Sequence, residues 1–560
     1  YMEHPITLKF KIPRQDLLAL SLFEPDTEAA SSWAQSLPLA NGTAPALLLV
    51  QALNDLNRTP LSPQLRYNIM EVLRPKIDDA QANLSKRFLN QPLVMPEASQ
   101  TAAELSDRLL TLNTTAFTVI AIETIQKHKT VHDTHPARLT CQAIQQALIF
   151  SGRKVLQRFQ LQWPMDVRGW ETLHQLYALA LNQHLADLPV PEPLSGGDTI
   201  TATYLQAIMI SCCNPNQLLQ GELTALHRGL QQWSELIKLD PHKNENSLFI
   251  VDLDSDHPPM YRAFYHEPPG PQCRLIDCTL LMEQLKILKK ETGTHGITFD
   301  EGIHISASLL DHLILSLCSV SPRNFKRSAS SDPLWLCLGL SSTHYHVAGK
   351  RLFEDLLDND DRQQRSQAAD DPFPPSNLTP DERYPIFKAQ LADTSPGGYC
   401  VEWPTDSPCD IRVGEVVGLK EDTGKKEWLI AVIRWLRRID NTKILIGVEL
   451  INPRAVAYGA SIQHKTGEKT APIRVLLLPE VTLVGQPNTL ITPRIGFREG
   501  QKLTLGNGIE SHDIKLLPSI DSRASFQQFQ FSYPRALGDV LAEGQQGQWN
   551  VYYDSLWSKI

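Results

Sequence analysis

Apolar residues recur every three or four positions through the first half of the chain. This spacing predicts helices over residues 103–127, 139–159, 170–185, 201–211 and 217–239. Ser62 and Pro63 are a typical helix start, and we expect Pro75 to end the helix that follows them. Only residues 6–12 alternate as a strand does. Residues 1–243 are therefore predicted to be a mainly α-helical domain, either a solenoid or an irregular bundle.

After residue 243 the pattern changes to short strands. Residues 248–253 and 273–278 are strand-like and 305–316 are helical, so 244–318 are predicted to be an α+β connector. Further strands are predicted over residues 334–347, 386–391, 399–403, 413–419, 428–435 and 444–450. They predict a small antiparallel β-barrel within residues 319–458. Residues 351–384 are rich in Asp, Gln, Pro and Ser, as in a solvated insertion.

A second run of short strands follows. Apolar stretches over residues 473–478, 488–492, 502–505, 513–517 and 526–531 are separated by turn residues. They predict a second small β-barrel over residues 470–534. Residues 535–560 form an aromatic tail whose spacing favours a packing helix. The predicted fold class is thus multidomain α plus β: a helical N-terminal region, an α+β connector and two barrels.

Composition narrows the possible functions. The chain has 560 residues, enough for several domains, and a formal net charge of −9. That charge argues against a nucleic-acid polymer as a partner, because such binding needs a basic field. No apolar stretch is long enough to span a bilayer and no signal peptide is evident, so the cytoplasm is the expected location. The nine cysteines contain no C-x-x-C pair and are expected to be buried thiols.

Two short motifs carry the most specific chemistry. Arg323 and Arg327 form an R-x-x-x-R pair ahead of the first predicted barrel strand. A guanidinium group can grip phosphate oxygens or a guanine edge through two parallel hydrogen bonds, and it can stack on a base. The pair alone is a common pattern that also fits a solvated basic loop.

The second motif lies in a turn between two predicted strands. Asp393, Ser395 and Gly398 form a D-x-S-x-x-G set. The carboxylate and hydroxyl offer acceptors for guanine N–H groups, and Gly397 and Gly398 allow the backbone to come close to a base.

Together, the two motifs and the strands that follow them resemble the PilZ domain, the small barrel that senses cyclic di-GMP in bacteria. The resemblance covers roughly residues 318–455. It implies that Arg323 and Arg327 clamp the ligand, that Asp393 and Ser395 bind a guanine, and that Gly398 shapes the turn. No other cofactor and no metal are implied. In this sequence residues 328–392 separate the two motifs, a longer interval than is usual in the family.

The neighbouring domains suggest how such a sensor would act. The connector resembles, in the order of its elements, the PilZ-related or YcgR-N-like barrel that precedes some PilZ domains. The second barrel is expected to lack the arginine pair. The helical region is expected to dock an unidentified protein partner, so we expect a bacterial effector without enzymatic activity that transmits cyclic-di-GMP binding by domain rearrangement.

Two alternatives remain open. The barrel could be degenerate and the protein a nucleotide-independent interaction scaffold, with the arginines as solvated charges. Asp252 and Asp254 lie at the end of a predicted strand, as in phosphotransferases that use an aspartate nucleophile, although a strand that runs into an acidic turn also explains them. His344 and His346 are expected to alternate on one strand, where a packing pair is favoured over metal ligands.

Overall fold

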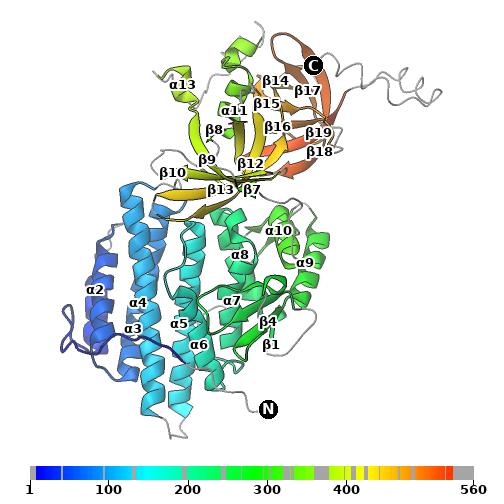
Figure 1. The fold of residues 1–560 in the computed structure, drawn as a ribbon. Coiled ribbons are helices and arrows are strands. Elements are labelled where there is room, and N and C mark those ends of the chain that lie inside the picture. The colour runs from blue at the N-terminus through cyan, green and yellow to red at the C-terminus, as the bar shows by residue number, and fades with distance from the viewer. Residues whose placement is uncertain are drawn as a thin grey trace. The chain divides into compact units, whose positions relative to one another are not determined.

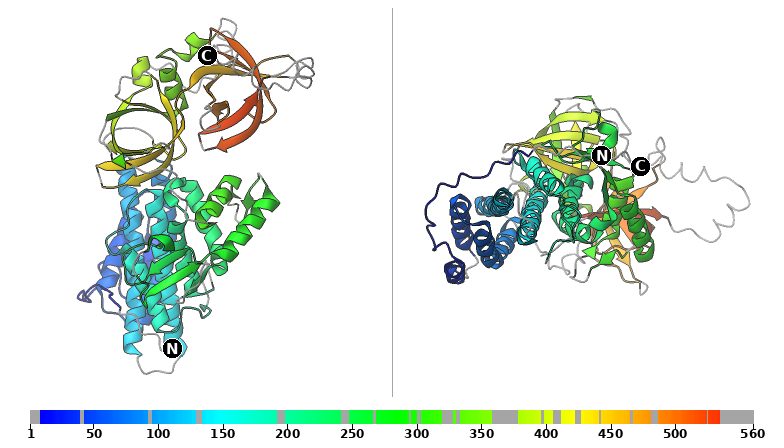
Figure 2. Two further views of the ribbon diagram at one scale, coloured as in Figure 1. Left: turned by 45° about the vertical axis from the view of Figure 1, so that its right-hand side comes forward. Right: turned by 90° about the horizontal axis from the view of Figure 1, so that it is seen from below.

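The computed structural model divides into two compact units (Figures 1 and 2). The first unit comprises residues 1–324 with 404–412 and 435–445, and the second comprises 325–403, 413–434 and 446–560. The structure describes residues 8–38, 42–91, 95–128, 134–191, 198–240, 247–265, 268–293, 295–299, 302, 304–318, 328–329, 333–357, 378–395, 398–404, 411–421, 427–440, 442–464, 467–480, 486–523 and 525–533. Among the described helices, none is long and apolar enough to cross a membrane.

Helices build most of the first unit. They are α1 (Thr27–Ser36), α2 (Ala44–Arg58), α3 (Pro63–Phe88), α4 (Glu97–Lys127), α5 (Thr134–Gln160), α6 (Gly169–Asn182), α7 (Ile200–Cys212) and α8 (Gln220–Trp233), with short 3-10 turns η1 (Pro215–Gln217) and η2 (Ser234–Leu236). The long helices α3, α4 and α5 stand side by side (Figure 1). Their apolar faces share one hydrophobic core, which confirms the predicted helical N-terminal region.

Helix α3 departs from the prediction at its end. Ser62 caps its N-terminus by accepting from the Leu65 amide, and Pro63 is its first residue, as expected. The prediction that Pro75 ends the helix was wrong, because α3 continues to Phe88. Leu73 before the proline and Ile77 after it are both fully buried, so packing on both sides offsets the backbone hydrogen bond that proline removes.

The α+β part of the first unit packs on the same core. Its elements are β1 (Lys238–Asp240), β2 (Phe249–Asp252), β3 (Met260–Tyr261), η3 (Arg262–Phe264), β4 (Cys273–Asp277), α9 (Thr279–Thr292), β5 (Ile297–Thr298), β6 (His304–Ile305) and α10 (Ala307–Cys318). Strands β1, β4, β2 and β3 form an antiparallel sheet in that order. Phe249 and Ile276 from this sheet and Leu313 from α10 belong to the helical core.

A barrel of six strands follows, and most of its residues belong to the second unit. Its elements are β7 (Ser328–Ala329), β8 (Pro333–Leu338), α11 (Gly339–Val347), η4 (Phe353–Leu356), α13 (Pro380–Arg383), β9 (Phe387–Ser395), β10 (Gly398–Pro404), β11 (Val416–Glu421), β12 (Leu429–Arg438) and β13 (Lys443–Asn452). The strand order is β10-β13-β12-β11-β8-β9, and β9 also pairs with β10, which closes the barrel (Figure 2, left). The short strand β7 adds to β9.

A second closed barrel follows directly. It consists of β14 (Val456–Gln463), β15 (Ile473–Leu478), β16 (Thr489–Pro493), β17 (Lys502–Gly506), β18 (Ser511–Ser522) and β19 (Phe526–Ser532), in the order β14-β15-β16-β19-β18-β17. Apolar side chains such as Tyr458, Leu503 and Phe529 fill its interior. The two barrels confirm the predicted fold class.

The two barrels share a hydrophobic core of their own. Val416, Ile430 and Val432 of the first barrel pack with residues of the second, which include Leu476, Leu478, Ile491 and Phe526. Phe353, Leu356 and Leu357, at the start of the predicted insertion, are also buried. Leu357 and Phe353 lie against Gly459 of β14. The described beginning of the insertion is thus packed on the second barrel, whereas residues 358–377 lie outside the described residues.

Candidate functional site

The Asp-x-Ser-x-x-Gly motif occupies the hairpin between β9 and β10. Asp393 and Ser395 are on β9, which ends at Ser395, and Gly398 is the first residue of β10. Gly398 pairs with Ser395 across the hairpin. Arg323, Arg327 and Gly397 lie outside the described residues.

Strand pairing brings the residues that follow the arginine motif next to the Asp-x-Ser-x-x-Gly motif. Ser328, which follows Arg327 directly in the sequence, pairs with Thr394, and Ala329 pairs with Asp393. The long sequence interval between the motifs is therefore closed by one antiparallel ladder. The predicted insertion separates β8 from β9 in the sequence, yet Leu336 of β8 pairs with Phe387 of β9. The insertion therefore leaves these two strands paired (Figure 1).

A β-bulge sets the face on which Asp393 lies. Leu391 pairs with Val401 and Asp393 pairs with Cys400, so Ala392 is an extra residue on β9. Directly opposed residues share a face, whereas Cys400 and Val401, as neighbours, lie on opposite faces. Asp393 is therefore on the opposite face of the sheet from Leu391, which the alternation of an unbroken strand would not give.

Gly398 is required by close packing against another strand. A Cβ at this position would lie 2.2 Å from the carbonyl oxygen of Val448 on β13. No side chain can occupy that space unless the backbone moves. The sequence prediction gave Gly398 a role in shaping the turn, and the structure adds this contact with β13.

Tyr399 comes directly after the motif and makes a polar contact that the sequence did not predict. Its hydroxyl donates to a carboxylate oxygen of Glu421 at 2.8 Å. Burial and the neighbouring Glu421 carboxylate both raise the pKa of the Tyr399 hydroxyl. The tyrosine is therefore a neutral donor at physiological pH. No motif signalled this pair, because its members are separated in sequence and belong to strands that are not neighbours in the barrel.

The histidine pair was misplaced in the prediction. The strand β8 ends at Leu338, and Gly339, with a φ of 84°, starts the helix α11, so His344 and His346 are helical. Their Nε2 atoms lie 3.0 and 2.9 Å from the backbone carbonyl oxygens of Tyr458 and Tyr384. Both side chains are buried. The favoured interpretation as a packing pair fits these contacts, with α11 lying between the two barrels.

The acidic turn after β2 has structural partners. Asp254 forms an ion pair with Lys9 at 2.6 Å. Asp256 accepts from the backbone amides of Arg168 and Glu171 and so caps the N-terminus of α6. These contacts explain an acidic turn at this place without phosphoryl chemistry. In the part of the chain that the structure describes, no group of three or more His, Cys, Asp or Glu residues could hold a metal ion.

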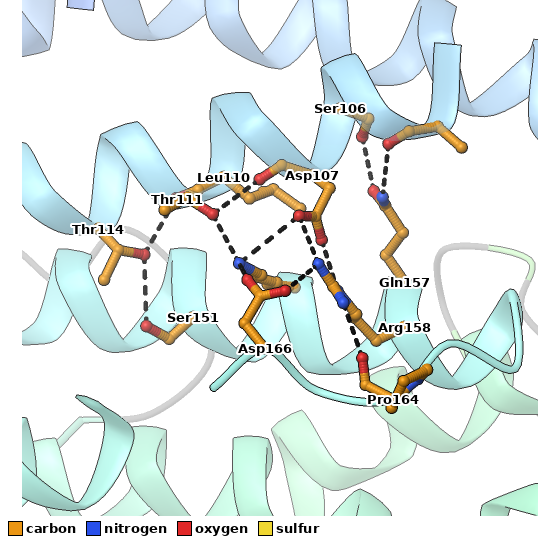
Figure 3. A network of polar contacts seen from close by, with 12 residues as sticks. Ser106, Asp107, Leu110, Thr111, Thr114, Ser151, Gln157, Arg158, Pro164 and Asp166 are labelled. Atoms are coloured by element: carbon orange, nitrogen blue, oxygen red, sulfur yellow. Dashed lines mark hydrogen bonds and ion pairs between the residues drawn. The ribbon is translucent and has the colours of Figure 1, made fainter. Parts of the chain in front are cut away.

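A second polar network lies between α4, α5 and the loop before α6 (Figure 3). Arg158 donates to both carboxylate oxygens of Asp107, at 2.8 and 2.7 Å, and contacts Asp166 at 2.5 Å. Lys154 also contacts Asp166. Burial opposes the ionisation of Asp166, but Lys154 and Arg158 together lower its pKa. The two cations and two anions balance, which is the behaviour of a structural cluster.

The R-x-x-x-R spacing also occurs in the second barrel, although we expected this barrel to lack it. Arg494 and Arg498 follow β16 and both are exposed. No Asp-x-Ser-x-x-Gly set occurs in the second barrel. The combination of the two motifs is therefore found in the first barrel alone, although the arginine spacing is not.

Comparison with known proteins covers almost the whole chain. Residues 28–243 match the family described as "Cyclic-di-GMP receptor FimW, N-terminal domain", and residues 248–381 and 371–456 match its "middle PilZ domain". The chain belongs to the family of PilZ-domain cyclic-di-GMP receptors. Residues 458–534 match the family's "FimW C-terminal beta-barrel domain".

One relative aligns along nearly its entire length. The cyclic-di-GMP receptor FimW of Pseudomonas aeruginosa is 28% identical over 572 aligned residues, which cover 94% of this chain and 93% of the relative. No solved structure matches. The recognition of a PilZ family from two short motifs is thus confirmed. The PilZ match begins at residue 248, although residues 249–317 share their hydrophobic core with the helices.

Proposed function

We propose that this protein is a bacterial receptor for cyclic di-GMP that binds the dinucleotide between the arginine segment and the β9–β10 hairpin. Arg323 and Arg327 clamp the phosphates and guanine edges of the ligand. Asp393 and Ser395 accept hydrogen bonds from a guanine, and the glycines of the turn, Gly397 and Gly398, leave room for the base. Cyclic di-GMP is a reversible ligand here, and no catalysis is proposed.

The pairing of β7 with β9 carries this proposal. Ser328 adjoins Arg327 in sequence and lies opposite Thr394, between Asp393 and Ser395. This pairing supports one binding place for a ligand that contacts both motifs. The relative from Pseudomonas aeruginosa is named as a cyclic-di-GMP receptor, and its alignment covers 94% of this chain.

Isothermal titration calorimetry of cyclic di-GMP into the full-length protein tests the site. We expect micromolar or tighter binding that is lost in the double variant Arg323→Ala, Arg327→Ala and is weakened in Asp393→Ala. The double variant Arg494→Ala, Arg498→Ala is a matched control, because it removes two arginines at the same spacing from the second barrel. It should bind like the native protein.

The outcomes separate the proposal from its rivals. If the native protein releases no heat near 100 μM ligand, its affinity is weaker than about −5.5 kcal/mol, and the nucleotide-independent scaffold becomes the better account. If the control pair loses binding while Arg323→Ala, Arg327→Ala retains it, the site is on the second barrel.

Signal transmission is the finer part of the proposal. The arginine segment lies in the chain between α10, which ends at Cys318, and β7, which starts at Ser328. Ligand that orders this segment would bias the arrangement of the two units and present the helical unit to a protein partner. Small-angle scattering at saturating ligand should therefore change for the native protein and stay constant for Arg323→Ala, Arg327→Ala. An unchanged native profile would contradict transmission but not binding.

A further inference from the structure

The hydrogen bond between Tyr399 and Glu421 links two strands that are not neighbours. In the barrel order β10-β13-β12-β11, two strands stand between the one that carries Tyr399 and the one that ends with Glu421. Backbone pairing therefore cannot hold these two strand ends together directly. The side-chain hydrogen bond of 2.8 Å does so.

The pair lies at the end of the barrel that carries the candidate site. Tyr399 is one residue after Gly398 and pairs with Thr394 of β9. Along β10 it alternates with Cys400 and so shares a face with Val401, which is fully buried. Glu421 is the last residue of β11, two residues after the fully buried Leu419. Both side chains thus extend the buried faces of their strands to the barrel rim.

We propose that Tyr399 is a positioning residue that holds the β9–β10 hairpin in its binding geometry through Glu421. This inference rests on the proposed function, because the hairpin carries Asp393 and Ser395. The tyrosine does not touch the ligand in this account. It acts by restricting the conformations of the turn before the ligand binds, so that binding costs less conformational entropy.

The second barrel provides a matched control. The hydroxyl of Tyr458 donates to a carboxylate oxygen of Glu510 at 2.5 Å, which is the same pair of groups. Tyr458→Phe therefore removes an equivalent hydrogen bond away from the hairpin. Any general effect of losing a partly buried hydrogen bond from a tyrosine hydroxyl should appear equally in both variants.

The first test compares affinities. Cyclic di-GMP should bind Tyr399→Phe about tenfold more weakly than the native protein, which corresponds to about 1.4 kcal/mol, whereas Tyr458→Phe should bind normally. Glu421→Ala should match Tyr399→Phe, and the two losses should not add in the double variant. Glu421→Gln, which keeps an acceptor oxygen, should restore most of the affinity.

The second test needs no ligand. Hydrogen exchange of amides in residues 391–401 should be faster in Tyr399→Phe than in the native protein and unchanged in Tyr458→Phe. Native-like exchange and affinity in Tyr399→Phe would overturn the inference. Normal binding by Glu421→Ala beside weak binding by Tyr399→Phe would overturn it as well, because the hydroxyl would then act directly on the ligand. If the native protein does not bind, the proposed function fails, and the exchange result still reports on the hydrogen bond.

Discussion

Only glycine fits at position 398, because a Cβ there would collide with the backbone of β13. A substitution must move β10, and β10 forms one side of the hairpin that carries Asp393 and Ser395. The same residue thus joins the packing of the barrel to the shape of the candidate site.

We predict that Gly398→Ala lowers the stability of the second unit by about 1–3 kcal/mol, the usual cost of overpacking, and weakens cyclic-di-GMP binding. Urea unfolding and calorimetry measure the two effects. Gly506→Ala is the control, because a Cβ at Gly506 of β17 meets no atom within 4 Å. Equal behaviour of the two variants would contradict the packing argument.

His344 makes the stability of the second unit depend on pH. Burial lowers its pKa to about 4, whereas an unfolded histidine titrates near 6.5. Between these values the unfolded chain takes up a proton that the folded chain does not, so stability falls as the pH drops below about 6.5.

Between pH 7 and pH 5 we expect His344 to account for a loss of about 2 kcal/mol. Urea midpoints should therefore fall less over this range in His344→Gln than in the native protein. If the urea midpoint of His344→Gln falls with pH as steeply as that of the native protein, this histidine is not the source of the pH dependence.

At the residue scale, the two motifs could be recognised in the sequence because each is a set of ligand-binding residue types at a fixed short spacing. It could not find Tyr399 and Glu421, because a hydroxyl and a carboxylate that meet across a barrel leave no local pattern. The face of the sheet on which Asp393 lies could not be predicted either. It depends on the bulge at Ala392, and the bulge is defined by the pairing of Leu391 with Val401 and of Asp393 with Cys400.

Among the elements, most helices and strands follow their apolar period, and the errors have local causes. Residues 334–347 form one apolar run, but Gly339 adopts a left-handed backbone conformation that ends β8 and begins α11. Pro75 lies inside α3, where tertiary packing outweighs the local penalty. In both cases the deciding contacts come from elsewhere in the fold.

The network between α4 and α5 offers a test at this scale. The side chain of Asp107 is 13% exposed and pairs with Arg158, whereas Asp78, which pairs with Arg153, is 45% exposed. Asp107→Ala removes one of the two carboxylates that neutralise the buried Lys154 and Arg158. It should therefore destabilise the helical unit by about 3 kcal/mol. Asp78→Ala should cost less than about 1 kcal/mol. Thermal or urea unfolding of the two variants measures the difference, and equal losses would refute the role of burial.

At the scale of the second unit, the sequence predicted two barrels but not their common core. A signal was present: residues 429–433 and 475–478 are unbroken apolar runs, as expected for strands that are buried on both faces. Which surface covers the outer face is a tertiary property that such a run does not encode.

We predict that the two barrels unfold as one cooperative body. Leu503→Ala, in the interior of the second barrel, should cost about 2–5 kcal/mol and should speed hydrogen exchange in β11 and β12 of the first barrel by a similar free energy. Hydrogen exchange with peptide resolution measures this. Faster exchange confined to residues 456–532 would show that the barrels are independent.

The common core also decides where the receptor can be cut and transplanted. A chimera that carried the first barrel alone into another protein would expose Val416, Ile430 and Val432 to water and leave an adhesive apolar surface. A portable cyclic-di-GMP sensor made from this chain therefore has to carry the second barrel along with the first, because only then does this apolar surface stay covered.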